Sequence, residues 1–193
     1  NVPVYVYTDY PTAELFVNGV SQGRQTKAVP VEPTTGNRRN KEVMKRFRLM
    51  WEEVKYVPGE IRVVAYDANG YPKMEKIVKT AGKPHRIELS TYRTSLTADG
   101  KDLAYITVKV VDKDGNLCPL DGRLMTFSVE GAGSYCASAN GDPTCLDIFH
   151  EPRMHAFNGM LTVIVQAGEK SGNVTLKVNA KGLKSGSLTL PVK

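Results

Sequence analysis

Residues 140–159, NGDPTCLDIFHEPRMHAFNG, are the part of the sequence whose side chains could do chemistry. The stretch carries groups used in acid–base catalysis and metal binding, with Cys136 just upstream: Asp142, Cys145, Asp147, His150, Glu151 and His155. The spacing of the two histidines fits neither the i, i+4 pair of a helical HExxH zinc site nor a same-face pair on a strand. The sequence also has no CxxC pair. We therefore expect no catalytic residue, no metal ion and no cofactor here.

The dipeptide Asn140-Gly141 predicts a two-residue β-hairpin, because its residue types adopt positive φ readily. Cys136 and Cys145 are equally far from this turn in the sequence. In a hairpin they would face each other at a non-hydrogen-bonded position, where the Cα atoms are close enough for a disulfide. The pattern therefore predicts a Cys136–Cys145 disulfide, formed in an oxidising compartment such as the periplasm.

The other polar residues of this stretch are expected to form a structured loop between strands. Asp142 and Arg153 carry opposite charges, and we expect them to form the internal ion pair of the loop. Asn158, within Phe-Asn-Gly, is expected to turn the chain back into a strand that contains Leu161. With Asn140 at the first turn, these residues predict a structured loop and not an active site.

Two acidic motifs elsewhere in the sequence are also expected to be structural and not catalytic or metal-binding. Glu52 and Glu53 follow Trp51, and glycosidases use paired carboxylates, but neighbours on a strand point to opposite faces and form no catalytic dyad. Alternation places Trp51 in the core with Phe47 and Leu49. Residues 112–116, DKDGN, begin like a calcium loop but lack its later Glu, so they predict a hairpin turn.

Composition sets the class of protein. Of 193 residues, 41% are hydrophobic and 24% are charged, as in soluble globular proteins. No apolar run approaches the ~20 residues that span a bilayer, so we expect no membrane span.

The chain begins at Asn1 without a signal-peptide pattern, and we expect a mature product or an excised fragment. The net charge of +6 is concentrated in residues 37–48, which we interpret as a solvated strand edge and not as a nucleic-acid site.

Nearly every segment alternates between apolar and polar residues, as half-buried strands do. Short strands separated by Asp-, Asn- and Gly-rich turns predict an all-β fold of two tandem immunoglobulin-like β-sandwich domains. Gly82-Lys83-Pro84 breaks the strand series and divides the chain into residues 1–82 and 83–193. The segments 58–70 and 171–182 have similar patterns, so we expect each half to end in the same hairpin.

Several motifs carry a resemblance to a known family. The motifs VYTDYPTAELFVNGVSQG, LMWEEVKYVPGEIRVVAYDANG and KTAGKP resemble the penultimate domain of bacterial glycoside hydrolase family 2 enzymes of the β-galactosidase type. The second half, with TADGKDLAYITVKVVDKDGNLCP, FSVEGAG, NGDPT and AFNGMLTVIV, is similar to their C-terminal domain. That domain in turn resembles the bacterial immunoglobulin-like repeats of adhesins. The resemblance covers essentially the whole chain, although Cys145 departs from the small polar residue expected there.

The resemblance implies that catalysis takes place elsewhere. In that family the two catalytic glutamates lie in a TIM-barrel domain upstream, and a barrel needs about 250 residues of alternating β and α pattern. Such a pattern is absent from this sequence, so no catalytic residue is carried over. The chain is therefore expected to be no enzyme by itself, and to be the accessory C-terminal region of a bacterial galactosidase with the catalytic barrel as its partner in cis.

An independent carbohydrate-binding or adhesin-type module is the alternative, and exposed aromatic rings that stack on sugars would favour it. Most aromatic residues occupy positions expected in the core, and the exceptions lie near turns or strand ends: Tyr10, Tyr71, Tyr92 and Tyr135. We therefore favour the accessory role, with glycan as an additional candidate partner. We expect no nucleic-acid partner, a third hypothesis that rests only on the basic cluster from Arg38 to Arg48. We expect a periplasmic, cell-envelope or secreted location in a bacterium.

Overall fold

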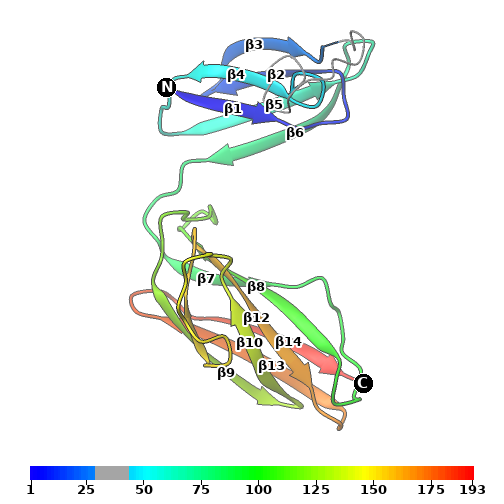
Figure 1. The fold of residues 1–193 in the computed structure, drawn as a ribbon, viewed down its shortest axis with the longest axis vertical. Coiled ribbons are helices and arrows are strands. Elements are labelled where there is room, and N and C mark those ends of the chain that lie inside the picture. Colours follow the sequence, from blue (N-terminus) through cyan, green and yellow to red (C-terminus); the bar gives the residue numbers. More distant parts are fainter. Residues whose placement is uncertain (29–43) are drawn as a thin grey trace. The chain divides into compact units, whose positions relative to one another are not determined.

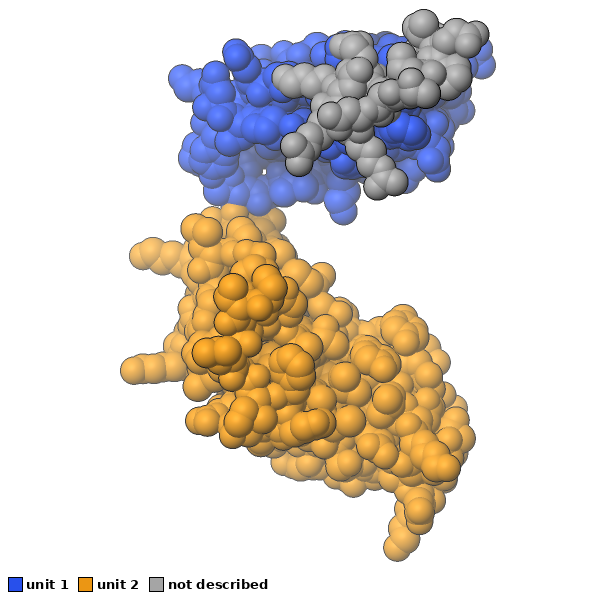
Figure 2. Space-filling view, viewed as in Figure 1, with its two compact units in different colours: residues 1–80 blue, residues 81–193 orange. Residues whose placement is uncertain are grey.

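The structure is a computed structural model that describes residues 1–28 and 44–193. It divides into two compact units, residues 1–80 and 81–193, coloured blue and orange in Figure 2. The division falls two residues before the end of the first predicted domain. Residues 37–43 of the basic run lie outside the described residues, and so does most of the proposed strand edge.

The described part of unit 1 contains two antiparallel sheets (Figure 1). One has the strand order β3-β2-β5-β6, and the other pairs β1 with β4. The strands are β1 (Val2–Val6), β2 (Thr12–Val17), β3 (Val20–Thr26), β4 (Leu49–Val54), β5 (Glu60–Tyr66) and β6 (Pro72–Lys79). Asn18 and Gly19 both have positive φ and join β2 to β3 in the tight turn expected of Asn-Gly.

Alternation in β2 directs Ala13, Leu15 and Val17 into the core of unit 1. Leu49 and Trp51 of β4 pack in the same cluster, and Trp51 Nε1 donates a hydrogen bond of 3.2 Å to the Gly23 carbonyl oxygen. Their predicted place in the core is confirmed.

The prediction for Phe47 is wrong. Its side chain is 63% exposed, because it precedes β4 in a turn where its N–H donates to the Met44 carbonyl oxygen. β4 itself begins only at Leu49, and its burial does not alternate strictly, because Met50 is buried between Leu49 and Trp51.

Unit 2 consists of two four-stranded antiparallel sheets, ordered β10-β12-β8-β7 and β11-β9-β13-β14 (Figure 1). The strands are β7 (Arg86–Ser90), β8 (Leu103–Val111), β9 (Leu124–Gly131), β10 (Gly133–Ala139), β11 (Arg153–His155), β12 (Met160–Ala167), β13 (Gly172–Ala180) and β14 (Gly186–Val192). Apolar residues of both sheets form one core, which makes the unit a β-sandwich.

Strict alternation in β12 explains its place in this core. Leu161, Val163 and Val165 are buried, and the residues between them are only partly buried. Leu176 and Val178 of β13 join them from the other sheet. Full burial of each such side chain contributes about 1.5–3 kcal/mol, so the two sheets are held face to face mainly by these rows.

The predicted all-β class is confirmed, and its immunoglobulin-like character stays a prediction. The expected closing hairpins are also present, since β5 pairs with β6 at the end of unit 1 and β13 pairs with β14 at the end of unit 2. Among the described residues, no helix has the length and apolarity required to cross a membrane.

Candidate functional site

The stretch 140–152 connects β10 to β11 in unit 2, and the predicted hairpin at Asn140-Gly141 is wrong. β10 pairs with β12, whereas β11 pairs with β9 in the other sheet. The connection therefore crosses from one sheet of the sandwich to the other. A local turn is nevertheless present, because Gly141 has positive φ and the Asp142 N–H donates to Asn140 Oδ1 at 3.0 Å.

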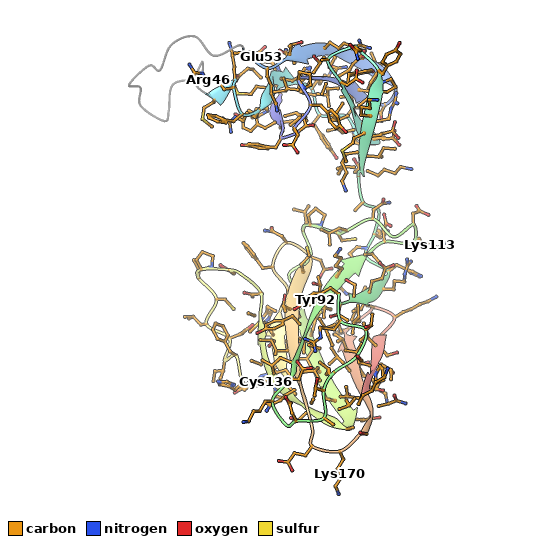
Figure 3. The ribbon with its side chains drawn as sticks, turned by 90° about the vertical axis from the view of Figure 1, so that its right-hand side faces the viewer. Arg46, Glu53, Tyr92, Lys113, Cys136 and Lys170 are labelled. Atoms are coloured by element: carbon orange, nitrogen blue, oxygen red, sulfur yellow. The ribbon has the colours of Figure 1, made fainter. Side chains whose placement is uncertain are left out.

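The loss of the hairpin removes the register that would set Cys136 opposite Cys145. Cys136 lies in β10 where the pairing with β12 is irregular, between Tyr135 and Ala137 (Figure 3). Cys145 lies in the loop, where Asn140 Nδ2 donates to its Sγ at 3.3 Å. Both cysteines are free thiols in the structure. The disulfide has therefore lost its geometric basis, and we do not propose it.

Asp147 of the loop and His155 at the end of β11 form the central polar contact of this region. Asp147 Oδ2 accepts hydrogen bonds from the His155 backbone N–H at 2.7 Å and from Nδ1 at 2.9 Å. These two bonds, the backbone bond most of all, hold the pKa of Asp147 below its usual range. Asp147 also interacts with the Cys145 thiol.

This arrangement is not that of a nucleophilic cysteine. Such a site needs the imidazole between thiol and carboxylate, so that the imidazole accepts the thiol proton. Here it is the Asp147 carboxylate that interacts with both Cys145 and His155. His150 lies elsewhere, with Nδ1 3.2 Å from the Cys136 carbonyl oxygen. In residues 1–28 and 44–193, no group of three His, Cys, Asp or Glu side chains is arranged to hold a metal ion.

The predicted Asp142–Arg153 ion pair is also wrong. Arg153 Nε donates to Glu151 at 2.7 Å, and Asp142 Oδ1 accepts from the N–H and hydroxyl of Thr144. The Asp142 side chain therefore caps the local turn with hydrogen bonds, as Asp side chains commonly do. The turn at Asn158 is confirmed, because Asn158 and Gly159 have positive φ and Phe157 and Met160 exchange backbone hydrogen bonds on entry to β12.

Tyr135 anchors this loop to β10, a role that the sequence did not indicate. Its hydroxyl lies 2.9 Å from Ser138 Oγ, 2.8 Å from the Phe149 carbonyl oxygen and 2.7 Å from that of Glu151. Its ring stacks on Phe127 with the centroids 5.9 Å apart. Burial raises the pKa of the phenol, which therefore stays protonated and able to donate. Its position near a strand end had suggested an exposed ring instead.

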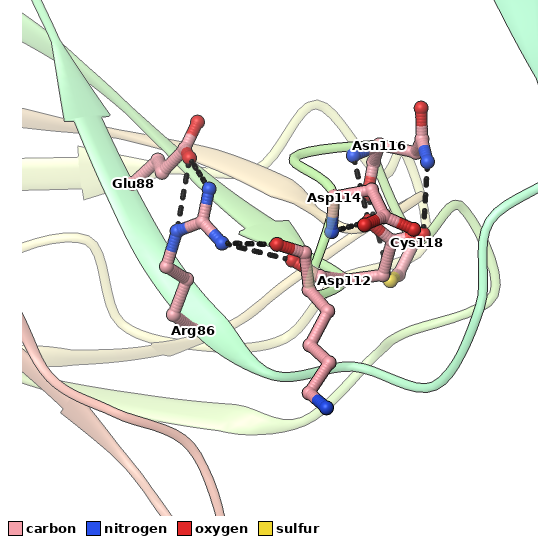
Figure 4. Close-up of polar contacts among 7 residues, drawn as sticks. Arg86, Glu88, Asp112, Asp114, Asn116 and Cys118 are labelled. Atoms are coloured by element: carbon pink, nitrogen blue, oxygen red, sulfur yellow. Dashed lines mark hydrogen bonds and ion pairs between the residues drawn. The ribbon is translucent and has the colours of Figure 1, made fainter.

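A second polar cluster surrounds Asp112, where the turn after β8 meets the segment that leads into β7 (Figure 4). The buried carboxylate accepts four hydrogen bonds: from the amides of Gly82, Asp114 and Asn116 at 2.7, 2.9 and 2.8 Å, and from Asn116 Nδ2 at 3.0 Å. The Gly82 bond contributes most, and together they lower the pKa of Asp112 to about 2.

Arg86 closes the cluster from β7. Its guanidinium donates to the carbonyl oxygens of Asp112 and Lys113 at 3.1 and 3.0 Å and pairs with Glu88 at 2.5 Å. Because N–H donors occupy the Asp112 oxygens, residues 112–116 form a hairpin turn and not a calcium loop. The turn is closed by a bond from the Asp112 N–H to the Asn116 carbonyl oxygen, which confirms its prediction.

The aromatic side chains are more exposed than we expected. Tyr71 and Tyr92 are exposed as predicted, with Tyr92 visible on unit 2 in Figure 3, but Tyr10 and Tyr135 are half-buried. Exposed rings that the sequence did not indicate belong to Tyr5, Tyr7, Phe47, Tyr56, Tyr105, Phe149 and Phe157. Glu52 and Glu53 are exposed on β4.

Comparisons with known proteins identify the family. Residues 87–189 match the glycoside hydrolase family 2 C-terminal domain 5, and residues 1–72 match a domain of unknown function, DUF4982. A β-galactosidase of Bacteroides ovatus is 36% identical over 184 residues, which are 95% of this chain and 20% of that protein. A β-glucuronidase of Formosa agariphila is 28% identical over 194 residues, 97% of this chain and 17% of that protein.

A solved structure agrees with these matches. The crystal structure of a glycosyl hydrolase family 2 member from Bacteroides cellulosilyticus has a TM-score of 0.83 and 31% identity, covering 99% of this chain and 23% of that one. The chain thus spans about a fifth of the length of the curated relatives it matches. Because one family model covers more than half of the chain, the resemblance seen in the motifs is confirmed, and the chain belongs to glycoside hydrolase family 2 as a C-terminal region.

Proposed function

We propose that this chain is the non-catalytic C-terminal region of a longer β-galactosidase and serves as an accessory to a TIM-barrel catalytic domain in cis. One observation carries the proposal: 95% of the chain aligns with only 20% of a β-galactosidase. The rest of that relative is about four times as long as the matched part, which leaves ample room for a barrel of about 250 residues.

The arrangement of polar groups supports the same role. Several carboxylates and one histidine of unit 2 are engaged in loop and turn contacts, namely Asp112, Asp147 and His155. Such contacts make the β-sandwich rigid. A rigid module joined to a barrel would stabilise it and limit access to its active site without taking part in bond cleavage.

The test compares the isolated chain with the polypeptide encoded by its full reading frame. Both are assayed with aryl β-galactosides, and an aryl β-glucuronide is included because one relative is a β-glucuronidase. We expect turnover of the β-galactoside by the full polypeptide only. Turnover by the isolated chain, or a reading frame without a barrel, would show the proposal to be wrong.

The accessory role itself needs a second measurement. A full polypeptide that is truncated before residue 1 of this chain is compared with the intact one for thermal inactivation and for kcat/KM. We expect the truncated form to lose activity at a lower temperature. Equal stability and equal kinetics would contradict an accessory role. The periplasmic, envelope or secreted location stays a prediction, which fractionation of cells that produce the full polypeptide tests.

A further inference from the structure

Unit 1 contains a groove that its core leaves open. The strand β6 is exposed along its whole length, although its neighbour β5 contributes to the core. In the register of β5 and β6, Met74 lies opposite Ala65 and Lys76 lies opposite Val63. The side chains of Met74 and Lys76 therefore lie on the face of the sheet that packs on the core. Met74 is nevertheless 62% exposed. The sheet formed by β1 and β4 therefore leaves this part of the larger sheet uncovered.

The groove has a volume of about 800 Å³, within the range of ligand sites. It is lined by residues of four segments of unit 1: 6–10, 47, 63 with 65, and 74–76. Three aromatic residues line it, namely Tyr7, Tyr10 and Phe47. Tyr7 and Phe47 are 67% and 63% exposed, so both rings present much of their surface to solvent. Neither ring is needed to fill the core of unit 1.

The Tyr7 ring is held in place before any ligand arrives. Arg48 Nη1 donates a hydrogen bond of 2.9 Å to the Tyr7 hydroxyl. The same guanidinium lies 4.1 Å above the centre of the Tyr5 ring. A ring fixed in this way loses little conformational freedom on binding, which favours its use as a stacking platform.

The polar groups of the groove narrow the class of ligand. Asp9 and Lys76 line it, and neither has an ion-pair partner among residues 1–28 and 44–193. Glu75 pairs with Arg62 at 3.1 Å. Protein–protein interfaces are enriched in aromatic residues and Met but depleted in charged side chains at their centre, so a protein contact is one of the outcomes that the test below distinguishes. A single Lys beside an Asp is a poor site for a polyanion, whose binding relies on several cations.

We propose that this groove binds a neutral oligosaccharide. The C–H face of a pyranose ring is apolar and flat enough to pack on the exposed rings of Tyr7 and Phe47. Its hydroxyl groups are hydrogen-bond donors and acceptors at once, so they match Asp9 as an acceptor and Lys76 as a donor. Binding here would hold a polymeric substrate near the parent enzyme. This inference does not depend on which domain carries out catalysis.

The test is calorimetric titration of the 193-residue chain with neutral β-linked galacto-, gluco- and manno-oligosaccharides at millimolar concentration. An oligomer of a uronic acid is the charged comparison. We expect saturable binding of at least one neutral oligosaccharide, weakened about tenfold by Tyr7→Ala and by Phe47→Ala. Tyr71→Ala is the matched control, because Tyr71 is equally exposed in unit 1 but does not line the groove, and its affinity should equal that of the wild type.

Thermal unfolding of each variant verifies that unit 1 stays folded. Absence of binding by every neutral sugar, stronger binding of the uronic acid oligomer, or wild-type affinity in Tyr7→Ala would each overturn the proposal. The remainder of the full polypeptide is also produced separately and mixed with the 193-residue chain. If the wild-type chain binds it and Tyr7→Ala does not, the groove is a protein contact and the proposal is wrong. A negative titration together with β-galactosidase activity of the full polypeptide would refute this inference and leave the proposed function standing.

Discussion

The Asp112 carboxylate accepts a hydrogen bond of 2.7 Å from the Gly82 backbone amide, across thirty positions of sequence. The bond ties the turn after β8 to the segment that precedes β7. Cys118 reinforces the same junction, because its Sγ lies 3.8 Å from the Gly82 carbonyl oxygen. The first residues of unit 2 are thus attached by polar contacts as well as by strand pairing.

Asp112→Asn should lower the stability of unit 2. The amide places an NH₂ group where the carboxylate accepts only N–H donors, so at least one donor loses its partner. We expect a lower midpoint of urea unfolding, followed by circular dichroism. Asp114→Asn is the control, because the Asp114 side chain is exposed and the turn uses only its backbone amide. Equal midpoints for the two variants would contradict the prediction.

The stability of the chain should fall as the pH is lowered from about 4 to about 2. The pKa of Asp112 is about 2 in the folded chain, against an ordinary value of 3.8, so the folded state binds fewer protons than the unfolded state in this range. The stabilisation is complete at about pH 5 and above and is lost progressively as the pH falls through the ordinary value and then through the folded pKa. Urea midpoints measured from pH 5 to pH 2 should decline less steeply in Asp112→Asn. An unchanged slope would disprove the assignment to Asp112.

Tyr135→Phe should loosen the loop between β10 and β11 without unfolding the sandwich. The change removes the hydroxyl beside the Phe149 and Glu151 carbonyl oxygens, a loss of about 0.5–1.5 kcal/mol. Because Phe149 is exposed, chymotrypsin should cleave after it faster in the variant, as followed by mass spectrometry. Tyr92→Phe is the control, since Tyr92 is exposed in the same unit and should leave the cleavage rate unchanged. Equal rates in all three proteins would exclude the anchoring role.

Gly159→Ala should destabilise the chain more than Gly141→Ala. Both glycines have positive φ, a conformation that costs Ala about 1–2 kcal/mol. A Cβ at position 159 would lie 2.2 Å from the Cys118 carbonyl oxygen, whereas a Cβ at position 141 would have no neighbour within 4 Å. The midpoint of thermal unfolding should therefore drop further for Gly159→Ala. The opposite order would contradict the packing of this turn.

All three cysteines should titrate as thiols in denaturant after purification without reductant, because none is bonded in the structure. Burial raises the pKa of Cys118, so this thiol should react slowest with a thiol reagent while the chain is folded. Reaction with a chromogenic disulfide, with and without urea, measures both properties. One titratable thiol in urea, with a mass two units lower, would instead restore the Cys136–Cys145 disulfide.

The strands and turns were accessible from the sequence, whereas the contacts of the loop were not. The alternation in β2 and β12 identified the buried faces, and Asn18-Gly19 and Asn158-Gly159 formed the expected turns. Asn140-Gly141 has the same residue types yet forms no hairpin, because the strand that follows it pairs with β9. The exposed groove of unit 1 could not be predicted by residue pattern.

Residue pattern alone was sufficient to predict the all-β class, the closing hairpins and the family, whereas the predicted boundary after residue 82 lies two residues beyond the end of unit 1. These follow from local properties, namely side-chain alternation, the φ preference of Asn-Gly and the order of motifs. The polar contacts became visible only in the folded chain. Asp147 is hydrogen-bonded to His155, Arg153 to Glu151, and Asp112 to the Gly82 amide. The physical reason is that polar partners depend on which strands pair and on which donors lie within about 3 Å, and neither is determined by the residue types alone.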